Sequence, residues 1–181
     1  MGKFFETFKN IWAIKELKDR ILFTMLMLFV YRLGSFIVLP GVNSMALEQA
    51  ISQNTGNDLL SLINTFTGGA FNQAAIFALG IMPYITASII VQLLGFAVPY
   101  FQKLQQKEGE SGRKKLTQIT RILTVFITLV QGGGYLTWLS QQPGAVHASL
   151  NPTIFWFSNI VILSTGTLFA MWMGEKITDK G

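Results

Sequence analysis

The sequence predicts an all-α integral membrane protein with four transmembrane helices. Half of its 181 residues are hydrophobic and only 13% are charged, whereas soluble domains carry about 25% charged residues. Four apolar segments hold one charged residue between them, Arg32, and they cover residues 21–40, 75–100, 122–140 and 154–174. Each segment has about the 20 helical residues that cross the hydrocarbon core of a bilayer.

Residues 1–20 precede the first predicted span and interleave apolar with basic residues. The spacing of the apolar residues allows them to share one helical face, and they are Phe4, Phe5, Phe8, Ile11, Trp12 and Ile14. The bases among and beside them are Lys3, Lys9, Lys15, Lys18 and Arg20. This pattern is typical of an amphipathic helix that lies in the membrane interface. A helix that docks on soluble protein is the alternative interpretation.

The basic residues outside the spans predict the orientation of the chain. They occur before the first span, in residues 101–121 between the second and third spans, and after the fourth span. The segments on the opposite side, 41–74 and 141–153, contain no Lys or Arg. Because basic loops stay in the cytoplasm, both ends of the chain and the loop 101–121 are expected to be cytoplasmic. The bases are explained by this topology, and we expect no direct nucleic-acid binding.

Residues 57–74, between the first two spans, predict a helix that is too short to cross. Its apolar residues are Leu59, Leu60, Leu62, Ile63 and Phe66, and the pair Gly68 and Gly69 ends it. About ten helical residues rise only about 15 Å. The segment fits a re-entrant half-helix, whose non-helical end must be buried in protein or line a cavity. It fits an external surface helix equally well.

The second span combines a proline with a mixed face. Pro83 cannot bond to the carbonyl of Leu79 and is expected to bend or loosen the helix there. Ile81, Ile85 and Ser88 share one helical face, and Gln92 lies one turn further on. Polar residues in an uncharged apolar helix indicate contact with a watery cavity or, equally, ordinary packing against another helix.

Arg32 and His147 are the remaining candidates for chemistry. A charge near the centre of a span costs at least about 2.5 kcal/mol, so Arg32 is expected to reach the external interface or to pair with a carbonyl. His147 lies among turn-forming residues and is expected to be solvated. All nine acids lie outside the spans, and the chain has no cysteine. Since no titratable groups converge, we expect no catalysis, no metal site and no cofactor.

Five segments match one known family in the same order along the chain. The longest is FALGIMPYITASIIVQLL at 77–94. The others are YRLGSFIVLPG at 31–41, FTGGAF at 66–71, KEGESGRKK at 107–115 and MGEKITDKG at 173–181. Together these segments resemble the SecY family of bacterial protein-conducting channels.

The resemblance implies a ten-helix pore made of two halves, with a side opening that faces lipid. Residues 1–20 would be its interfacial helix and 21–181 its first channel half. Residues 57–74 would be a plug helix that returns into the channel mouth, with Leu59, Leu60, Leu62, Ile63, Phe66, Gly68 and Gly69 as its characteristic residues. Ile81 and Ile85 would belong to the aliphatic constriction ring. The side gate, where signal sequences lodge, would use Thr86, Ile89, Ile90 and Gln92.

The resemblance also implies a substrate and partners. The channel would pass unfolded polypeptides across the bacterial inner membrane and release hydrophobic segments into lipid. Its partners would be the SecE and SecG subunits, the SecA motor ATPase, the ribosome with its nascent chain, signal peptides and membrane lipids. Family members continue through a second half, so we expect this chain to be the N-terminal part. The alternatives are a subunit of a small-solute transporter, which should carry polar groups near the midplane, and a structural membrane anchor.

Overall fold

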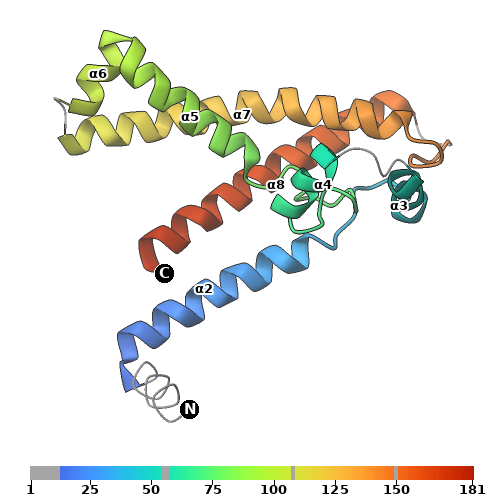
Figure 1. Cartoon of the computed structure of the whole chain (residues 1–181), viewed down its shortest axis with the longest axis horizontal. Coiled ribbons are helices and arrows are strands. Elements are labelled where there is room, and N and C mark those ends of the chain that lie inside the picture. Colours follow the sequence, from blue (N-terminus) through green and yellow to red (C-terminus); the bar gives the residue numbers. More distant parts are fainter. Residues whose placement is uncertain (1–12, 54–57, 107–108, 149–150) are drawn as a thin grey trace.

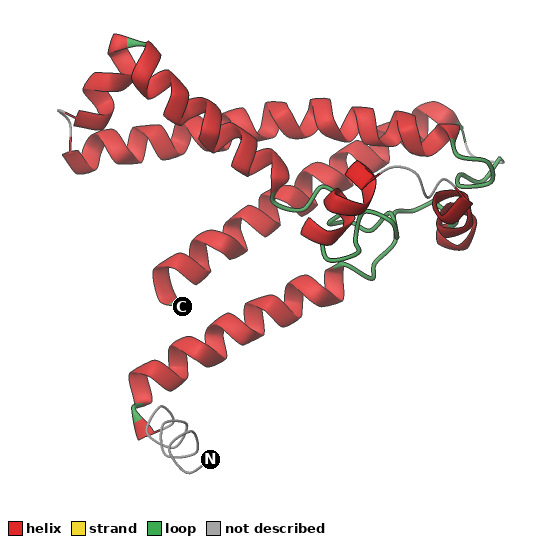
Figure 2. Cartoon of the chain, in the orientation of Figure 1, coloured by secondary structure: helices red, strands yellow, loops and turns green. Residues whose placement is uncertain are grey.

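The computed structural model describes residues 13–53, 58–106, 109–148 and 151–181, and its regular elements are helices (Figures 1 and 2). Within these ranges, strand-like pairing is limited to two isolated bridges, Val38 with Ala75 and Val42 with Val146. The all-α prediction is confirmed. The helices are α2 (Lys15–Gly34), α3 (Ser44–Gln53), α4 (Asp58–Phe66), α5 (Met82–Ala97), α6 (Pro99–Gln106), α7 (Gly109–Gln141) and α8 (Pro152–Lys180).

Two of these helices, α7 and α8, are long and apolar enough to cross a membrane. The α5–α6 pair is a third candidate if the two helices, bent by 101°, form one broken span. Helix α2 differs because charged residues crowd its first turns and because it ends at Gly34, well before residue 40. The described helices therefore support two or three spans, and the number four stays a prediction.

The predicted interfacial helix lies largely outside the described residues, which begin at position 13. Ile14 has an extended backbone, with φ −89° and ψ 106°, and α2 starts directly after it. Residues 15–20 are thus continuous with the first apolar segment, and they do not form a separate helix.

The second apolar segment departs most from its prediction. It is not one helix over 75–100, because residues 67–81 form turns and α5 begins only at Met82. Pro83 lies in the first turn of α5, where a missing N–H costs nothing. The predicted bend at Pro83 within a continuous helix is therefore wrong. A sharp bend occurs instead after Ala97, where Val98 is extended before Pro99, as the residue before a proline prefers.

Residues 101–121, predicted as a loop between spans, are mostly helical. Helix α6 continues to Gln106, and α7 begins at Gly109, well before the apolar stretch at 122. The ion pair of Glu110 with Lys114, at 2.9 Å and one turn apart, is of the kind that supports exposed helices.

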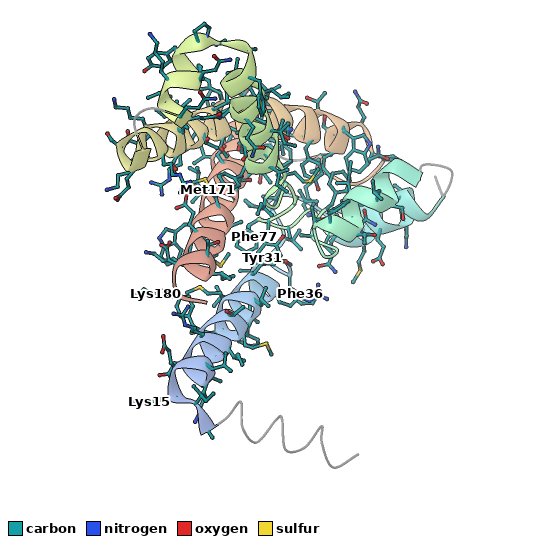
Figure 3. The ribbon with its side chains drawn as sticks, turned by 60° about the vertical axis from the view of Figure 1, so that its left-hand side comes forward. Lys15, Tyr31, Phe36, Phe77, Met171 and Lys180 are labelled. Atoms are coloured by element: carbon teal, nitrogen blue, oxygen red, sulfur yellow. The ribbon has the colours of Figure 1, made fainter. Side chains whose placement is uncertain are left out.

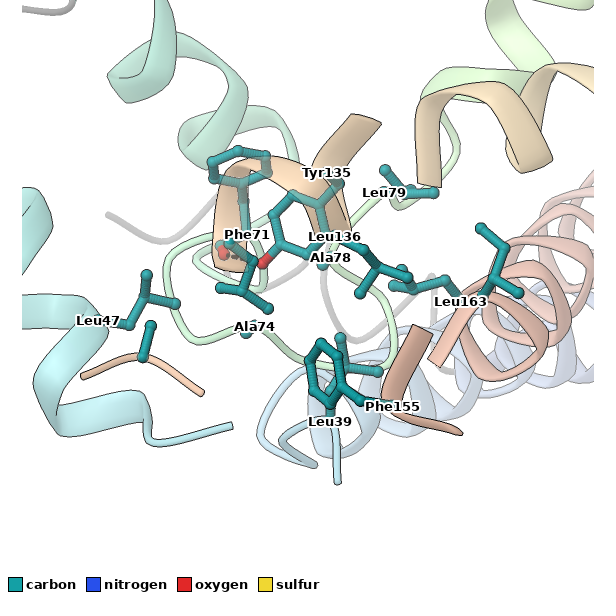
Figure 4. Close-up of a cluster of buried hydrophobic side chains, with 13 residues drawn as sticks. Leu39, Leu47, Phe71, Ala74, Ala78, Leu79, Tyr135, Leu136, Phe155 and Leu163 are labelled. Carbon is teal, nitrogen blue, oxygen red and sulfur yellow. Dashed lines mark hydrogen bonds between the residues drawn. The ribbon is translucent and has the colours of Figure 1, made fainter. Parts of the chain in front are cut away.

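The turns at 67–81 lie in the centre of the molecule, and most of their residues are buried. Ala70, Ala74, Ala75 and Ala78 are all 0% exposed. Buried backbone must find hydrogen-bond partners, and here residues 37–39 supply them. The Leu39 N–H donates to Ala74 O at 2.8 Å, and the Ile76 N–H donates to Ile37 O at 2.9 Å. Side chains from α3, α7 and α8 complete this core, which Figure 4 shows.

Aromatic side chains join the same segment to α2 and α8. Phe77 stacks on Tyr31 with 5.0 Å between ring centroids, and the two lie side by side in Figure 3. On its other side Phe77 stacks on Phe169 of α8 at 6.1 Å. Gly34 leaves room for this ring, since a Cβ there would overlap it.

Helices α7 and α8 are joined along their length. The two helices approach closely at Gly132 of α7. A Cβ at this position would lie 2.8 Å from the Ile160 side chain, so the approach depends on glycine. At the other end of the pair, Arg121 binds the Glu175 carboxylate with two nitrogens, Nε at 3.1 Å and Nη2 at 2.6 Å.

The fold separates the basic segments from the segments without bases. The start of α2, the start of α7 and the end of α8 lie on one side of the molecule, and α3 lies on the other (Figure 1). Arg20 donates to Gly181 O at 3.2 Å on the basic side. On the opposite side Asn43 N donates to Ala145 O at 2.8 Å. The segregation seen in the sequence is thus also a segregation in space.

Candidate functional site

The diglycine closes α4 with a defined turn. Gly68 N donates to Thr65 O at 3.2 Å, and Gly69 N donates to Asn64 O at 2.9 Å. Gly68 has φ +63° and Gly69 has φ +91°. This pair of bonds around a left-handed residue is the Schellman motif, which favours glycine because a side chain would be strained there. The sequence prediction that Gly68 and Gly69 end the helix is confirmed.

The α4 side chains that the structure describes differ in burial. Ile63 packs against the buried core, whereas Leu62 is 55% exposed and Phe66 is 67% exposed. Leu59 and Leu60 lie in the first turn of the helix. The chain therefore presents a short apolar helix with an uncovered side, attached to buried turns by two glycines.

Arg32 reaches this turn from the last turn of α2. Its Nη1 donates to Gly68 O at 2.6 Å, and its guanidinium carbon lies 4.8 Å from the centre of the Phe36 ring. Both contacts are favourable for a guanidinium, which combines planar N–H donors with a face that stacks on aromatic rings. The expectation that Arg32 pairs with a carbonyl is confirmed.

The turns that follow are anchored to α7 by a buried bond. The Tyr135 hydroxyl donates to Phe71 O at 2.8 Å, and the two rings lie 4.9 Å apart (Figure 4). The backbone N–H of Phe71 donates to the nearby Thr67 Oγ1 at 3.2 Å. No local sequence pattern predicts the Tyr135 contact, because a tyrosine in a span has many alternative partners.

Ile81 and Ile85 lie at the N-terminal end of α5 on its uncovered face. Ile81 is the N-cap residue, and its carbonyl accepts the first helical bond from Ile85 N at 3.1 Å. The buried residues of α5 follow one line four residues apart, Pro83, Ala87, Val91 and Gly95. Positions two residues away point to the opposite side of a helix, which is why Ile81 and Ile85 remain 38% and 43% exposed.

The residues predicted for the side gate continue along α5. Ile89 and Ile90 are exposed. The Thr86 hydroxyl donates to Met82 O at 3.0 Å, and Gln92 Nε2 donates to Ser88 Oγ at 3.2 Å. The Thr86 hydroxyl and the Gln92 amide nitrogen thus already donate a hydrogen bond within α5. A molecule that bound to this face would therefore meet apolar side chains with only weak polar groups between them. The structure brings these residues together with Ile81 and Ile85 on one helix.

Among the described residues, the structure shows no group of acidic, histidine or cysteine side chains that could hold a metal ion. His147 is exposed in the loop after α7, and its backbone N–H donates to Gly41 O at 3.1 Å.

The apolar helices and the buried turns between them define this chain as a helical membrane protein. The SecY family model matches residues 75–181, and the chain belongs to the SecY family. It is 46% identical over 170 residues to "Protein translocase subunit SecY" of Escherichia coli strain K12, covering 93% of this chain and 38% of that protein.

Other relatives with the same name agree. The protein of Buchnera aphidicola subsp. Acyrthosiphon kondoi is 46% identical over 170 residues, which is 93% of this chain and 47% of the relative. The protein of Aquifex aeolicus strain VF5 is 40% identical over 179 residues, 97% of this chain and 42% of the relative. The chain thus spans less than half the length of these relatives.

Proposed function

We propose that this chain is the first half of a channel that conducts unfolded polypeptides across a membrane and releases hydrophobic segments sideways into lipid. Membership in the SecY family supports the proposal, because the named relatives are translocase subunits. The single observation that carries it is the uncovered aliphatic pair Ile81 and Ile85 at the start of α5. Exposed apolar side chains of this kind fit a surface that a second half would complete.

Ile81 and Ile85 would form part of the constriction. A narrow apolar ring resists ions because their dehydration there is costly. Aliphatic side chains also make no directional bonds, so they can part around any passing chain. The energy for transport would come from a partner.

Helix α4 with Gly68 and Gly69 would be the plug of the closed channel. The support is its exposed apolar side, its attachment through two glycines and its position directly before the buried turns. Thr86, Ile89, Ile90 and Gln92 would line the side gate, where an apolar signal peptide would meet a mainly apolar surface.

The location and partners follow from the same proposal. The chain would lie in the bacterial inner membrane with both ends of the sequence in the cytoplasm, as the positions of its bases favour. SecE and SecG would complete the channel, and SecA or a ribosome with its nascent chain would engage it from the basic side. The competing transporter function has less support, because Arg32 is the one formal charge in the predicted spans and it is bonded to a carbonyl.

The test is a pair of double variants of the full-length channel. Ile81→Ser with Ile85→Ser should wet the constriction, raise ion leakage and relax the rejection of defective signal sequences. Ile81→Leu with Ile85→Leu keeps the apolar volume and should leave both properties nearly unchanged. Proteoliposome leakage and export of a reporter with a defective signal measure the two effects. If the serine pair seals as well as the leucine pair, the constriction role is wrong.

A further inference from the structure

The turn after α4 contains a buried, anchored part and, just before it, a glycine with open space around it. Phe71 is buried, and its carbonyl is bound by Tyr135. Gly69, two residues earlier, has open space around it, with no described atom within 4 Å of the position of a Cβ. Rotation at Gly68 and Gly69 would move α4 relative to the turns at 70–81, and it would also break the bonds from Asn72 N to Asn64 Oδ1 and from Phe71 N to Thr67 Oγ1, which cross the two glycines.

The hydrogen bonds around the diglycine differ in what they join. Most link residues of the segment to each other, such as Gly69 N to Asn64 O and Asn72 N to Asn64 Oδ1 at 3.1 Å. The bond from Gly69 N keeps the shape of the turn, whereas the bond from Asn72 N ties α4 to the residues after the glycines and must break if α4 swings away. The bond from Arg32 to Gly68 O instead joins the turn to a different helix, α2. A rotation at Gly69 that swings α4 away would carry this carbonyl away from Arg32.

The surroundings of Arg32 make this bond a strong one. A charged donor strengthens a hydrogen bond roughly twofold relative to a neutral donor. The Phe36 ring lies against one side of the guanidinium, which limits its alternative positions. The Arg32 side chain belongs to an apolar stretch of α2. If it lost the Gly68 carbonyl, its charge would have few other partners there.

We propose that Arg32 is a positioning residue that latches α4 in its closed position by holding the Gly68 carbonyl. The proposal rests on the proposed function of α4 as a plug. Opening the plug must break the Arg32 bond, so this residue sets how often an idle channel opens. Arg32 itself has no contact with the translocating chain in this role.

The experiment uses four versions of the full-length channel, with Arg32→Met and a deletion of residues 59–67 made singly and together. Methionine keeps a long side chain but lacks the charge and the donors. In the intact channel Arg32→Met should raise ion leakage about tenfold. Loss of one charge-assisted hydrogen bond shifts the equilibrium between the closed and open positions of α4 by about that factor. In the deleted channel, which lacks the plug, the same substitution should add nothing.

A second variant separates the hydrogen bond from general damage. Arg32→Lys retains a donor that reaches the carbonyl but loses the planar stacking on Phe36, so its leakage should fall between those of Arg32→Met and the unaltered channel. Protein yield and detergent stability should be equal for both variants.

Each outcome has a separate meaning. If the deletion raises leakage but Arg32→Met does not, the latch is wrong and the plug assignment stands. If Arg32→Met raises leakage equally with and without the plug, Arg32 acts elsewhere and the latch is again wrong. If the deletion leaves leakage unchanged, the plug assignment fails and the latch fails with it.

Discussion

Gly166 of α8 is the position where a single methyl group should disturb the buried turns. A Cβ at Gly166 would overlap the Ile76 carbonyl oxygen and lie 3.1 Å from its carbon, with Phe77 Cδ1 at 3.4 Å. The turn cannot easily withdraw, because its far side is pinned by the bond from Ile76 N to Ile37 O at 2.9 Å. Gly166→Ala therefore forces either α8 or the turn to move.

The size of the effect follows from two opposing terms. The carbonyl must retreat by roughly 1 Å to reach an ordinary contact distance, and overpacking of this kind costs about 1–3 kcal/mol. Alanine recovers up to about 1 kcal/mol through its better helix propensity. Because the obstacle is backbone rather than a flexible side chain, we expect a net loss of about 1–2 kcal/mol of stability.

The matched control is Gly174→Ala on the same helix. A Cβ at Gly174 would meet no described atom within 4 Å, so this substitution gains the propensity without the clash. Thermal unfolding of the full-length channel in detergent should show a midpoint lowered by a few degrees for Gly166→Ala and unchanged or raised for Gly174→Ala. Equal midpoints for the two variants would show that the turn does not press on α8.

Two further predictions concern topology and the pairing of α7 with α8. In intact cells expressing a full-length channel without other cysteines, an impermeant thiol reagent should label His147→Cys but not Glu110→Cys; the reverse pattern would invert the proposed orientation. Arg121→Glu and Glu175→Arg should each lower the thermal midpoint, since each removes an exposed pair worth about 0.5–1 kcal/mol and places like charges together. The double swap should recover most of the loss, and failure to recover would mean that the pair is incidental.

The sequence predicted the features that depend on composition and local chemistry. Apolar length predicted α7 and α8, the short apolar run predicted α4, and Gly68 and Gly69 predicted its end. Because a charge in an apolar segment must be compensated, the sequence predicts that Arg32 reaches the external interface or pairs with a carbonyl, and the structure shows the carbonyl. Which carbonyl it finds depends on a contact 36 residues away along the chain, and a local pattern holds no information about such a contact.

The second span shows why the remainder could not be predicted. Hydropathy treats residues 75–100 as one apolar run, but an apolar run is equally compatible with buried turns when other segments satisfy the backbone. Here residues 37–39 provide the hydrogen bonds and Gly166 provides the space. Gly80, with φ +53°, and Pro83 are the local signs that a helix starts late. Neither is decisive alone, since both also occur within membrane helices.

The buried turns give the two proposed moving parts a common support. A gate needs an element that changes position and a rigid element against which it moves. Residues 70–79 fit the rigid role, because α2, α7 and α8 contact them through Phe77, Tyr135 and Gly166. Helix α4 joins this support at one end through two glycines, and α5 joins it at the other end next to Ile81. In the proposed channel the plug and the constriction would therefore move against the same core, so damage to the core should affect both, while damage to Arg32 should affect only the plug.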